Sequence, residues 1–276
     1  MPLFTIDSRL CKACGLCVQA CPAGLVRQEA PEAPPSPLSG REANCILCGH
    51  CLAACPSGAF EHDLLPGGDP EPVRRRDRPG FTAVASLLKA RRSCRHYRPE
   101  PLSREDLAEL LRVADFAPTG HNTRQVGFVV VEGQESMARV REGIADWMRA
   151  EVRAETPLAA TLHLAGSGRA LAKGKDVVLR RAPNLVVAHA PEPDLGLTPE
   201  IDAVIAVSWL EIAAQAKGLG ACWCGYLMFA LAGHPPLAEL LGIPKGRRGY
   251  AALLLGRPAW RYTRIPPRDS LPVSFF

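Results

Sequence analysis

Eight cysteines near the N-terminus fall into two runs that share one spacing, C-x2-C-x2-C-x3-C-P. Three thiolates at this spacing can wrap around one 4Fe-4S cluster, while the fourth cysteine of the run reaches a neighbouring cluster. We therefore expect two 4Fe-4S clusters with exchanged fourth ligands. The expected ligand sets are Cys11, Cys14, Cys17 and Cys55 for one cluster, and Cys45, Cys48, Cys51 and Cys21 for the other.

Zinc and disulfides are the alternative uses of so many cysteines. Structural zinc usually takes two C-x2-C pairs, or one such pair with histidines, and a disulfide framework does not need two copies of one four-cysteine register. Gly15 and Gly49 occupy matching places in the two runs, where a glycine lets the backbone turn closely past the sulfurs. Residues 1 to about 62 resemble a bacterial-type two-cluster ferredoxin, with residues 22–44 expected to form an exposed loop between the runs.

The rest of the 276-residue chain is long enough for one further domain with a substantial core. A segment rich in proline, glycine and arginine at 63–80 has the composition of a linker. We therefore expect a cluster domain at 1–62, a linker at 63–80 and a second domain at 81–276.

Composition excludes several classes of protein. The net charge of +5 comes without a basic stripe interleaved with aromatic residues, so we expect no nucleic-acid partner. The most apolar run, 204–216, is too short to span a bilayer, and no secretion signal opens the chain, so we expect no membrane association. Eleven cysteines without a disulfide pattern predict a reducing compartment, with the cytoplasm as the default.

Three polar motifs are spaced along the second domain. Arginines and a serine crowd into Arg91-Arg92-Ser93-Cys94-Arg95, directly after a predicted helix at 81–90. Guanidinium forks donate paired hydrogen bonds to phosphate oxygens, although arginine-rich helix ends are also commonly solvated. The sequence A-P-T-G-H-N at 117–122 precedes a predicted strand at 126–132, and G-L-G-A-C-W-C-G at 218–225 follows an apolar helix predicted at 201–218.

In this order the motifs resemble those of the FMN-dependent nitroreductase family. The resemblance implies an α+β fold, in which a three-layer α/β/α nitroreductase-like domain follows the small two-cluster ferredoxin domain. It also implies a homodimer with FMN at the subunit interface. By this resemblance the phosphate and ribityl contacts are Arg91, Arg92, Ser93 and Arg95, and the flavin contacts across the dimer are Pro118, Thr119, Gly120 and Asn122.

The third motif is expected to form a loop that runs along the flavin, and the resemblance assigns flavin-side positions to Trp223, Cys224 and Gly225. The main-chain N–H of Cys224 is expected to point toward flavin N5. The side chains of Cys222 and Cys224 are interpreted as small buried hydrophobes rather than a redox dithiol. A segment at 256–268 resembles the C-terminus of ferredoxin-fused nitroreductases; it adds Arg264, and more weakly Arg268, as phosphate contacts, with a solvated basic tail as the alternative.

Together the two domains predict an FMN-dependent oxidoreductase. Iron-sulfur clusters carry single electrons, and FMN can collect them and deliver a hydride to an electron-poor acceptor such as a nitroaromatic, a quinone or an activated alkene. The donor would be a reduced ferredoxin-like protein or NAD(P)H, and no side chain is identifiable as a catalytic acid. Two alternatives stay open: a non-catalytic electron-transfer relay, and a dehydrogenase that passes electrons outward through the clusters.

Overall fold

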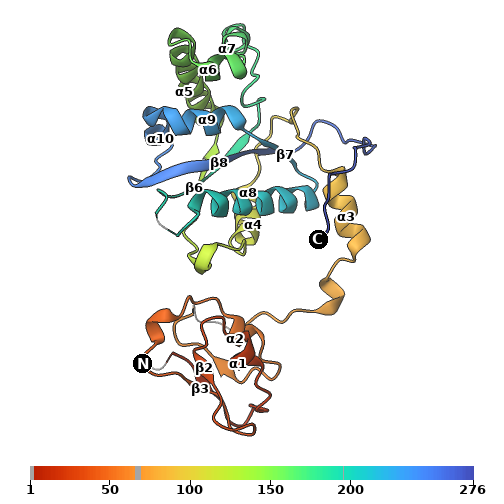
Figure 1. The fold of residues 1–276 in the computed structure, drawn as a ribbon. Helices are drawn as coiled ribbons and strands as arrows, with labels where there is room; N and C mark the ends of the chain where they lie inside the picture. Colours follow the sequence, from red (N-terminus) through yellow and green to blue (C-terminus); the bar gives the residue numbers. More distant parts are fainter. Residues whose placement is uncertain (1–2, 66–69, 195) are drawn as a thin grey trace. The chain divides into compact units, whose positions relative to one another are not determined.

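The computed structural model describes residues 3–65, 70–194 and 196–276, and the chain divides into two compact units (Figure 1). The first unit ends at Arg78 and also includes His121–Thr123, and the second comprises Pro79–Gly120 and Arg124–Phe276. The linker predicted at 63–80 includes residues 66–69, which lie outside the described residues.

The first unit consists of two short helices and two short strand pairs around a small core. Strand β1 (Thr5–Ile6) pairs with β4 (Phe60–Glu61), and β2 (Val26–Arg27) pairs with β3 (Ser36–Pro37), both antiparallel. The remaining elements are α1 (Leu16–Ala20), the 3-10 turn η1 (Glu42–Asn44), α2 (His50–Ala53) and the 3-10 turn η2 (Arg75–Asp77). The segment at 22–44 is therefore more than the loop expected from sequence, because main-chain bonds between β2 and β3 give it a ribbon of its own.

The second unit is built on a four-stranded antiparallel sheet. Its strands are β5 (Gly127–Glu132), β6 (Asn184–Pro191), β7 (Gly220–Trp223) and β8 (Arg247–Gly256), in the order β5-β6-β8-β7. Strands β6 and β8 lie in the middle, and their almost continuous apolar sequences suit burial on both faces. The expectation of a loop at 221–226 was wrong for its first residues, because residues 220–223 pair with β8 as an edge strand.

Helices cover both faces of this sheet, as Figure 1 shows. One apolar cluster joins the sheet to α5 (Gln134–Arg153), α7 (Leu164–Ala172), α9 (Gly225–Gly233) and α10 (Pro235–Leu240), and a second joins its other face to α4 (Arg104–Ala114) and α8 (Pro199–Ala216). This confirms the three-layer α/β/α domain. The remaining elements are the helices α3 (Phe81–Ala90) and α6 (Pro157–Thr161) and the 3-10 turn η3 (Gly120–Asn122). No helix in the described part of the chain is both long and apolar enough to cross a bilayer.

Candidate functional site

The two cysteine runs of the first unit fold in the same way. Helix α1 begins after Gly15 and α2 begins after Gly49, and both glycines have a φ of 69°, which disfavours any residue with a Cβ. The third cysteine of each run, Cys17 or Cys51, is carried inward by its helix and is 8% exposed. The repeated spacing therefore encodes a repeated loop-and-helix structure.

Each buried cysteine has the fourth cysteine of the other run as a neighbour. Burial raises the pKa of the Cys17 thiol, and the nearby sulfurs of Cys55 and Cys14 raise it further. Burial likewise raises the pKa of Cys51 to about 11, with the sulfur of Cys21 as the largest contribution from another thiol. The neighbours of Cys17 are thus Cys55 and Cys14, and those of Cys51 are Cys21 and Cys48, which is compatible with the predicted ligand sets.

Polar groups surround several of these sulfurs. The main-chain N–H of Ala13 donates to Cys11 Sγ at 3.4 Å, and that of Leu25 donates to Cys21 Sγ at 3.2 Å. His62 Nε2 lies 3.6 Å from Cys45 Sγ. Such donors stabilise thiolate ligands and tune the potential of an iron-sulfur cluster. In the described residues no three His, Cys, Asp or Glu side chains converge as the ligands of a single metal ion would.

In the second unit, the arginine run lies alongside the tryptophan motif. Ser93 forms a parallel bridge with Ala221 of β7, and the main-chain N–H of Cys94 donates to the carbonyl oxygen of Ala221 at 2.8 Å. The structure thereby brings two of the three predicted flavin segments together, although they are more than a hundred residues apart in sequence. Gly220 allows this close approach, because a Cβ there would lie 2.6 Å from Cys94 Sγ.

A basic cavity of about 430 Å³ opens beside the end of α3. It is lined by Leu88, Lys89, Arg91, Arg92, Ile265, Pro266 and Arg268. The cavity gathers three of the predicted phosphate contacts, whereas Ser93, Arg95 and Arg264 do not line it. Lys89 was missed from sequence, although its place in the last turn of the helix before the arginine run was a usable signal. Arg268, considered the weaker C-terminal candidate, lines the cavity and Arg264 does not.

A buried glutamate of α8 contacts both of these segments. Glu211 is 8% exposed, and its Oε1 accepts a hydrogen bond from Arg91 Nη1 at 3.1 Å. Its Oε2 accepts from the indole N–H of Trp223, also at 3.1 Å. Glu211 was not predicted as a site residue, although a charged residue in a helix that is apolar on nearly all sides is itself a signal.

The loop that carries Pro118 and Thr119 is held by a second acid of α8. The main-chain N–H of Gly120 donates to Asp202 Oδ1 at 3.0 Å, and Asp202 is 6% exposed. The main-chain N–H of Arg124 donates to Thr119 Oγ1 at 3.1 Å. Asn122, which clusters with the first unit, donates its side-chain amide to the carbonyl oxygens of Ile46 and Leu47.

The main-chain conformation of this loop is unusual. Non-glycine residues in the left-handed region occur at His121, Asn122 and Arg124, with φ between 49° and 54°. Backbone of this kind costs free energy and persists only where its surroundings hold it in place. The hydrogen bonds that Asp202 and Thr119 accept from Gly120 and Arg124 supply part of that restraint.

Cys224 is a core residue whose N–H is already used. Its main-chain N–H donates to the carbonyl oxygen of Ala252 at 2.9 Å, so the expectation that this group points toward a flavin was wrong. The reason is that pairing between β7 and β8 continues one residue past Trp223. Helix α9 begins at Gly225, where first-turn N–H groups have no acceptor within the helix, so Gly225 is the nearest donor of this kind.

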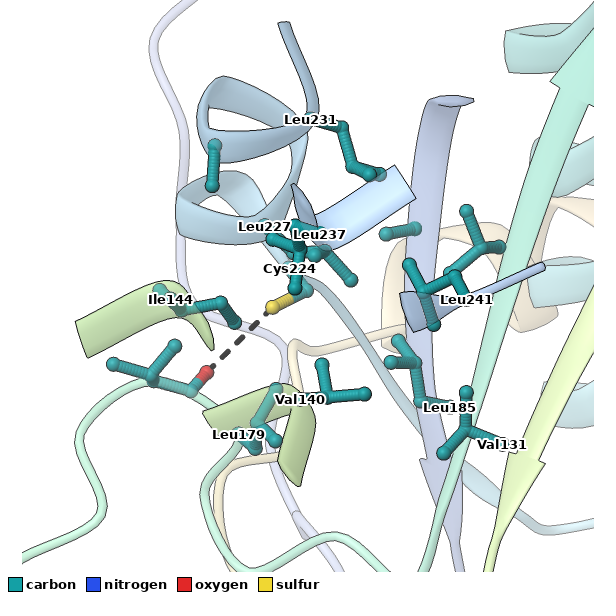
Figure 2. Close-up of a cluster of buried hydrophobic side chains, with 14 of the residues drawn as sticks. Val131, Val140, Ile144, Leu179, Leu185, Cys224, Leu227, Leu231, Leu237 and Leu241 are labelled. Carbon is teal, nitrogen blue, oxygen red and sulfur yellow. Dashed lines mark hydrogen bonds between the residues drawn. The ribbon is translucent and has the colours of Figure 1, made fainter. Parts of the chain in front are cut away.

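The thiol of Cys224 faces the apolar cluster shown in Figure 2, beside Leu227, Leu237 and Ile144. It contacts the carbonyl oxygen of Val178 at 3.7 Å, and burial raises its pKa to about 12. Burial also raises the pKa of Cys222. Both thiols are therefore protonated at neutral pH, as expected for small buried hydrophobic residues rather than for a redox dithiol.

Two protein-family models match separate parts of this chain. The model of the nitroreductase family matches residues 88–257, and the model of the 4Fe-4S dicluster domain matches residues 10–60. The FMN reductase [NAD(P)H] of Bacillus subtilis strain 168 is 28% identical over 186 residues, which cover 66% of this chain and 69% of the relative.

Two further proteins are similar over the second unit. The 5,6-dimethylbenzimidazole synthase of Rhodospirillum rubrum is 34% identical over 152 residues, covering 51% of this chain and 68% of the relative. The crystal structure of a nitroreductase with bound FMN from Bacteroides fragilis NCTC 9343 superposes with a TM-score of 0.56 and 21% identity, covering 70% of this chain and 96% of that one. That superposition shows the shared fold.

Proposed function

The chain belongs to the nitroreductase family, and on that premise we propose that it is an FMN-dependent oxidoreductase supplied with electrons by its own pair of 4Fe-4S clusters. The observation that carries the proposal is the meeting of the arginine run with β7 beside the basic cavity, within the fold of that family. Proteins similar to this chain are an FMN reductase and a nitroreductase with bound FMN.

The residues present fit FMN. Its phosphate is a dianion, and the basic cavity offers the side chains of Lys89, Arg91, Arg92 and Arg268. Trp223 and Gly225 would hold the ring side, with Thr119 and Gly120 supplied by the loop that Asp202 anchors. FMN, when bound, supplies the exchange between single-electron and hydride chemistry.

The residues of the first unit fit two clusters. The proposed ligands are the eight thiols in two exchanged sets, and the apolar residues Leu3, Phe4, Leu25 and Phe60 pack with the buried Cys17 and Cys51. The clusters, when assembled, supply single-electron transfer at potentials that ligand identity leaves open over roughly −700 to +450 mV. The main-chain donors at Cys11 and Cys21 hold their sulfurs in place.

The acceptor proposed is a small electron-poor molecule, such as a nitroaromatic, a quinone or an activated alkene. No described side chain stands out as a catalytic acid, which suits acceptors that take a proton from solvent after hydride transfer. A reduced ferredoxin-like protein is the proposed donor for the clusters, with NAD(P)H as the alternative that the name of the Bacillus subtilis relative suggests.

A second copy of the chain is the proposed partner. Helix α8 exposes Ile201, Val204, Trp209 and Ile212 to 37–51%, and Phe116 at the end of α4 is 80% exposed. An apolar surface of this kind on one element is typical of a protein interface. We propose a homodimer that covers α8 and completes the flavin site with the loop at 118–122.

Anaerobic reduction of the purified protein tests the function. We expect about eight irons and one FMN per chain, bleaching of the cluster absorbance by a low-potential donor before that of the flavin, and reoxidation by a nitroaromatic. Reduction without turnover of any small acceptor would instead indicate the relay, and flavin reduction by an organic substrate followed by cluster reduction would indicate the outward dehydrogenase. Protein without flavin would contradict the proposal.

A further inference from the structure

Glu211 occupies a position where an apolar residue would be the default. Its neighbours along α8 include Leu210 and Ala214, both fully buried, and the helix is apolar on nearly all sides. Burying a carboxylate is unfavourable unless it is paired and hydrogen-bonded, and a buried ion pair replaced as a whole by hydrophobic side chains is often at least as stable. A glutamate at this position is therefore not required by the packing of the helix.

Both oxygens of this carboxylate accept hydrogen bonds, each from a different one of the predicted flavin segments. Oε1 accepts from Arg91, in the run at 91–95, and Oε2 accepts from the indole of Trp223, in the motif at 218–225. The Arg91 side chain is 29% exposed, so this ion pair is shielded from solvent more than a surface pair. One buried group thus fixes a guanidinium that lines the basic cavity and an aromatic ring on β7.

The bridge also changes the electrostatics of the site. The Arg91 guanidinium is directed toward a carboxylate and is partly neutralised by it. Among the residues that the structure describes, the other cations of the cavity, Lys89, Arg92 and Arg268, form no ion pair with an acid. A fixed negative charge near a flavin opposes the increase of negative charge that accompanies its reduction. Glu211 is therefore placed to act on both the binding and the reduction of FMN.

We propose that Glu211 is a positioning residue for FMN: it orients Arg91 and Trp223 together, and its charge lowers the reduction potential of the bound flavin. This inference rests on the proposed function. Asp202 holds the remaining flavin segment, at 117–122, through the main-chain N–H of Gly120. Glu211 differs because it contacts the side chains of the two segments that it joins.

Three substitutions separate positioning from plain structural support. Glu211→Gln keeps the size and one acceptor oxygen but removes the charge. Glu211→Leu restores the apolar default of the helix and removes both hydrogen bonds. Glu109→Gln is the matched control, because Glu109 is a surface acid whose recorded partner is Lys217.

The experiment uses the full chain with its clusters, stripped of FMN and titrated with FMN while flavin fluorescence is followed. We expect Glu211→Leu to weaken FMN binding by about ten-fold or more. It should also lower the apparent melting temperature of the FMN-free protein, because Arg91 and the indole N–H of Trp223 lose their acceptor. We expect Glu211→Gln to weaken binding less and to raise the flavin potential, measured against a reference dye. Glu109→Gln should match the natural protein in both.

A double substitution gives the independent check. If Glu211 acts through Arg91, the combined Arg91→Gln and Glu211→Gln protein should bind FMN no more weakly than the worse single variant, so the two losses should not multiply. FMN affinity and potential unchanged in both Glu211 variants would overturn the inference while the natural protein still bound FMN. An unchanged flavin potential in Glu211→Gln, with FMN affinity falling only in variants whose melting temperature also falls, would overturn it in favour of a structural role. A natural protein that binds no FMN would instead refute the proposed function.

Discussion

The carboxylate of Asp202 accepts a hydrogen bond from the main-chain N–H of Gly120 at 3.0 Å, and this contact joins helix α8 to the loop with left-handed residues at 121, 122 and 124. The acid is buried, so water does not replace it easily as an acceptor. The conformation of the loop therefore depends on one side chain from a distant part of the chain.

Removing this acceptor should loosen the loop. Asp202→Ala leaves the N–H of Gly120 unpaired, at a cost of about 1–3 kcal/mol, so we expect a lower melting temperature and faster hydrogen exchange at 118–124. Asp202→Asn keeps an acceptor oxygen and should lose less. Asp115→Asn, at an exposed position after α4, is the control. Unchanged exchange in Asp202→Ala would mean that the loop is held by other contacts.

The exchanged cysteine sets predict which double substitutions spare a cluster. Cys14→Ser with Cys55→Ser removes two ligands of one cluster, so about four irons per chain should remain. Cys14→Ser with Cys21→Ser removes one ligand from each cluster, so both should be unstable and the iron content should fall further. Iron analysis with electron paramagnetic resonance of the reduced proteins distinguishes the two. The reverse ranking would indicate that each run holds its own cluster.

The basic cavity predicts a preference for the phosphate of FMN. Lys89→Met should weaken FMN binding by roughly ten-fold, the loss of one charged hydrogen bond, and should leave riboflavin binding almost unchanged, because riboflavin has no phosphate. Titration of the FMN-free protein with each flavin gives the ratio of affinities. Lys245→Met, outside the residues that line the cavity, is the control. Equal weakening of both flavins would place Lys89 outside the phosphate site.

His189 should make the stability of the second unit depend on pH. Burial lowers its pKa, and the adjacent Arg247, whose Nε donates to His189 Nδ1 at 2.7 Å, lowers it further. Above the unfolded pKa of about 6.5 both states are neutral and no dependence arises. Below it the unfolded chain binds the proton first, so stability falls as the pH decreases toward the folded pKa.

The measurement is the apparent melting temperature from pH 8 to pH 5. His189→Gln keeps a polar side chain that does not titrate, so its curve should decline less on the acid side than that of the natural protein. His163→Asn, at an exposed residue in the left-handed region, should follow the natural curve. Parallel curves for all three proteins would exclude His189 as the source of the dependence.

The buried thiol of Cys224 should matter for stability and not for electron transfer. Cys224→Ala removes one sulfur from the core, and we expect a loss of about 1–2 kcal/mol with FMN content and flavin reduction retained. Cys224→Ser places a hydroxyl in the same apolar cluster and should be less stable than the alanine variant. Anaerobic reduction and thermal unfolding of both variants check this. Loss of flavin reduction in a folded alanine variant would indicate a redox thiol.

Local motifs were predictable from sequence because their geometry is local. The loop and helix of each cysteine run follow from a spacing within a dozen residues, and the apolar patterns indicated the helices at 81–90 and 201–218 and the strand at 126–132. The contact of Ser93 with Ala221 was not predictable, since pairing between distant segments leaves no trace in either one. Asp202 was missed for a related reason: its role becomes apparent only when its partner Gly120 is known.

The Cys224 amide illustrates the same limit. A loop at 221–226 would have left its N–H groups available, whereas an edge strand uses them. The segment is a strand because it pairs with β8, which lies nearly thirty residues further along the chain. The sequence motif marks this segment, but which of its N–H groups are free depends on its pairing with β8.

The two walls of the basic cavity come from opposite ends of the second unit: Lys89, Arg91 and Arg92 follow the first helix, and Ile265, Pro266 and Arg268 belong to the extended C-terminal segment. A phosphate bound in this cavity would contact both walls at once. FMN binding would therefore stabilise the packing of the C-terminal segment against the first helix of the unit, although the two are far apart in sequence.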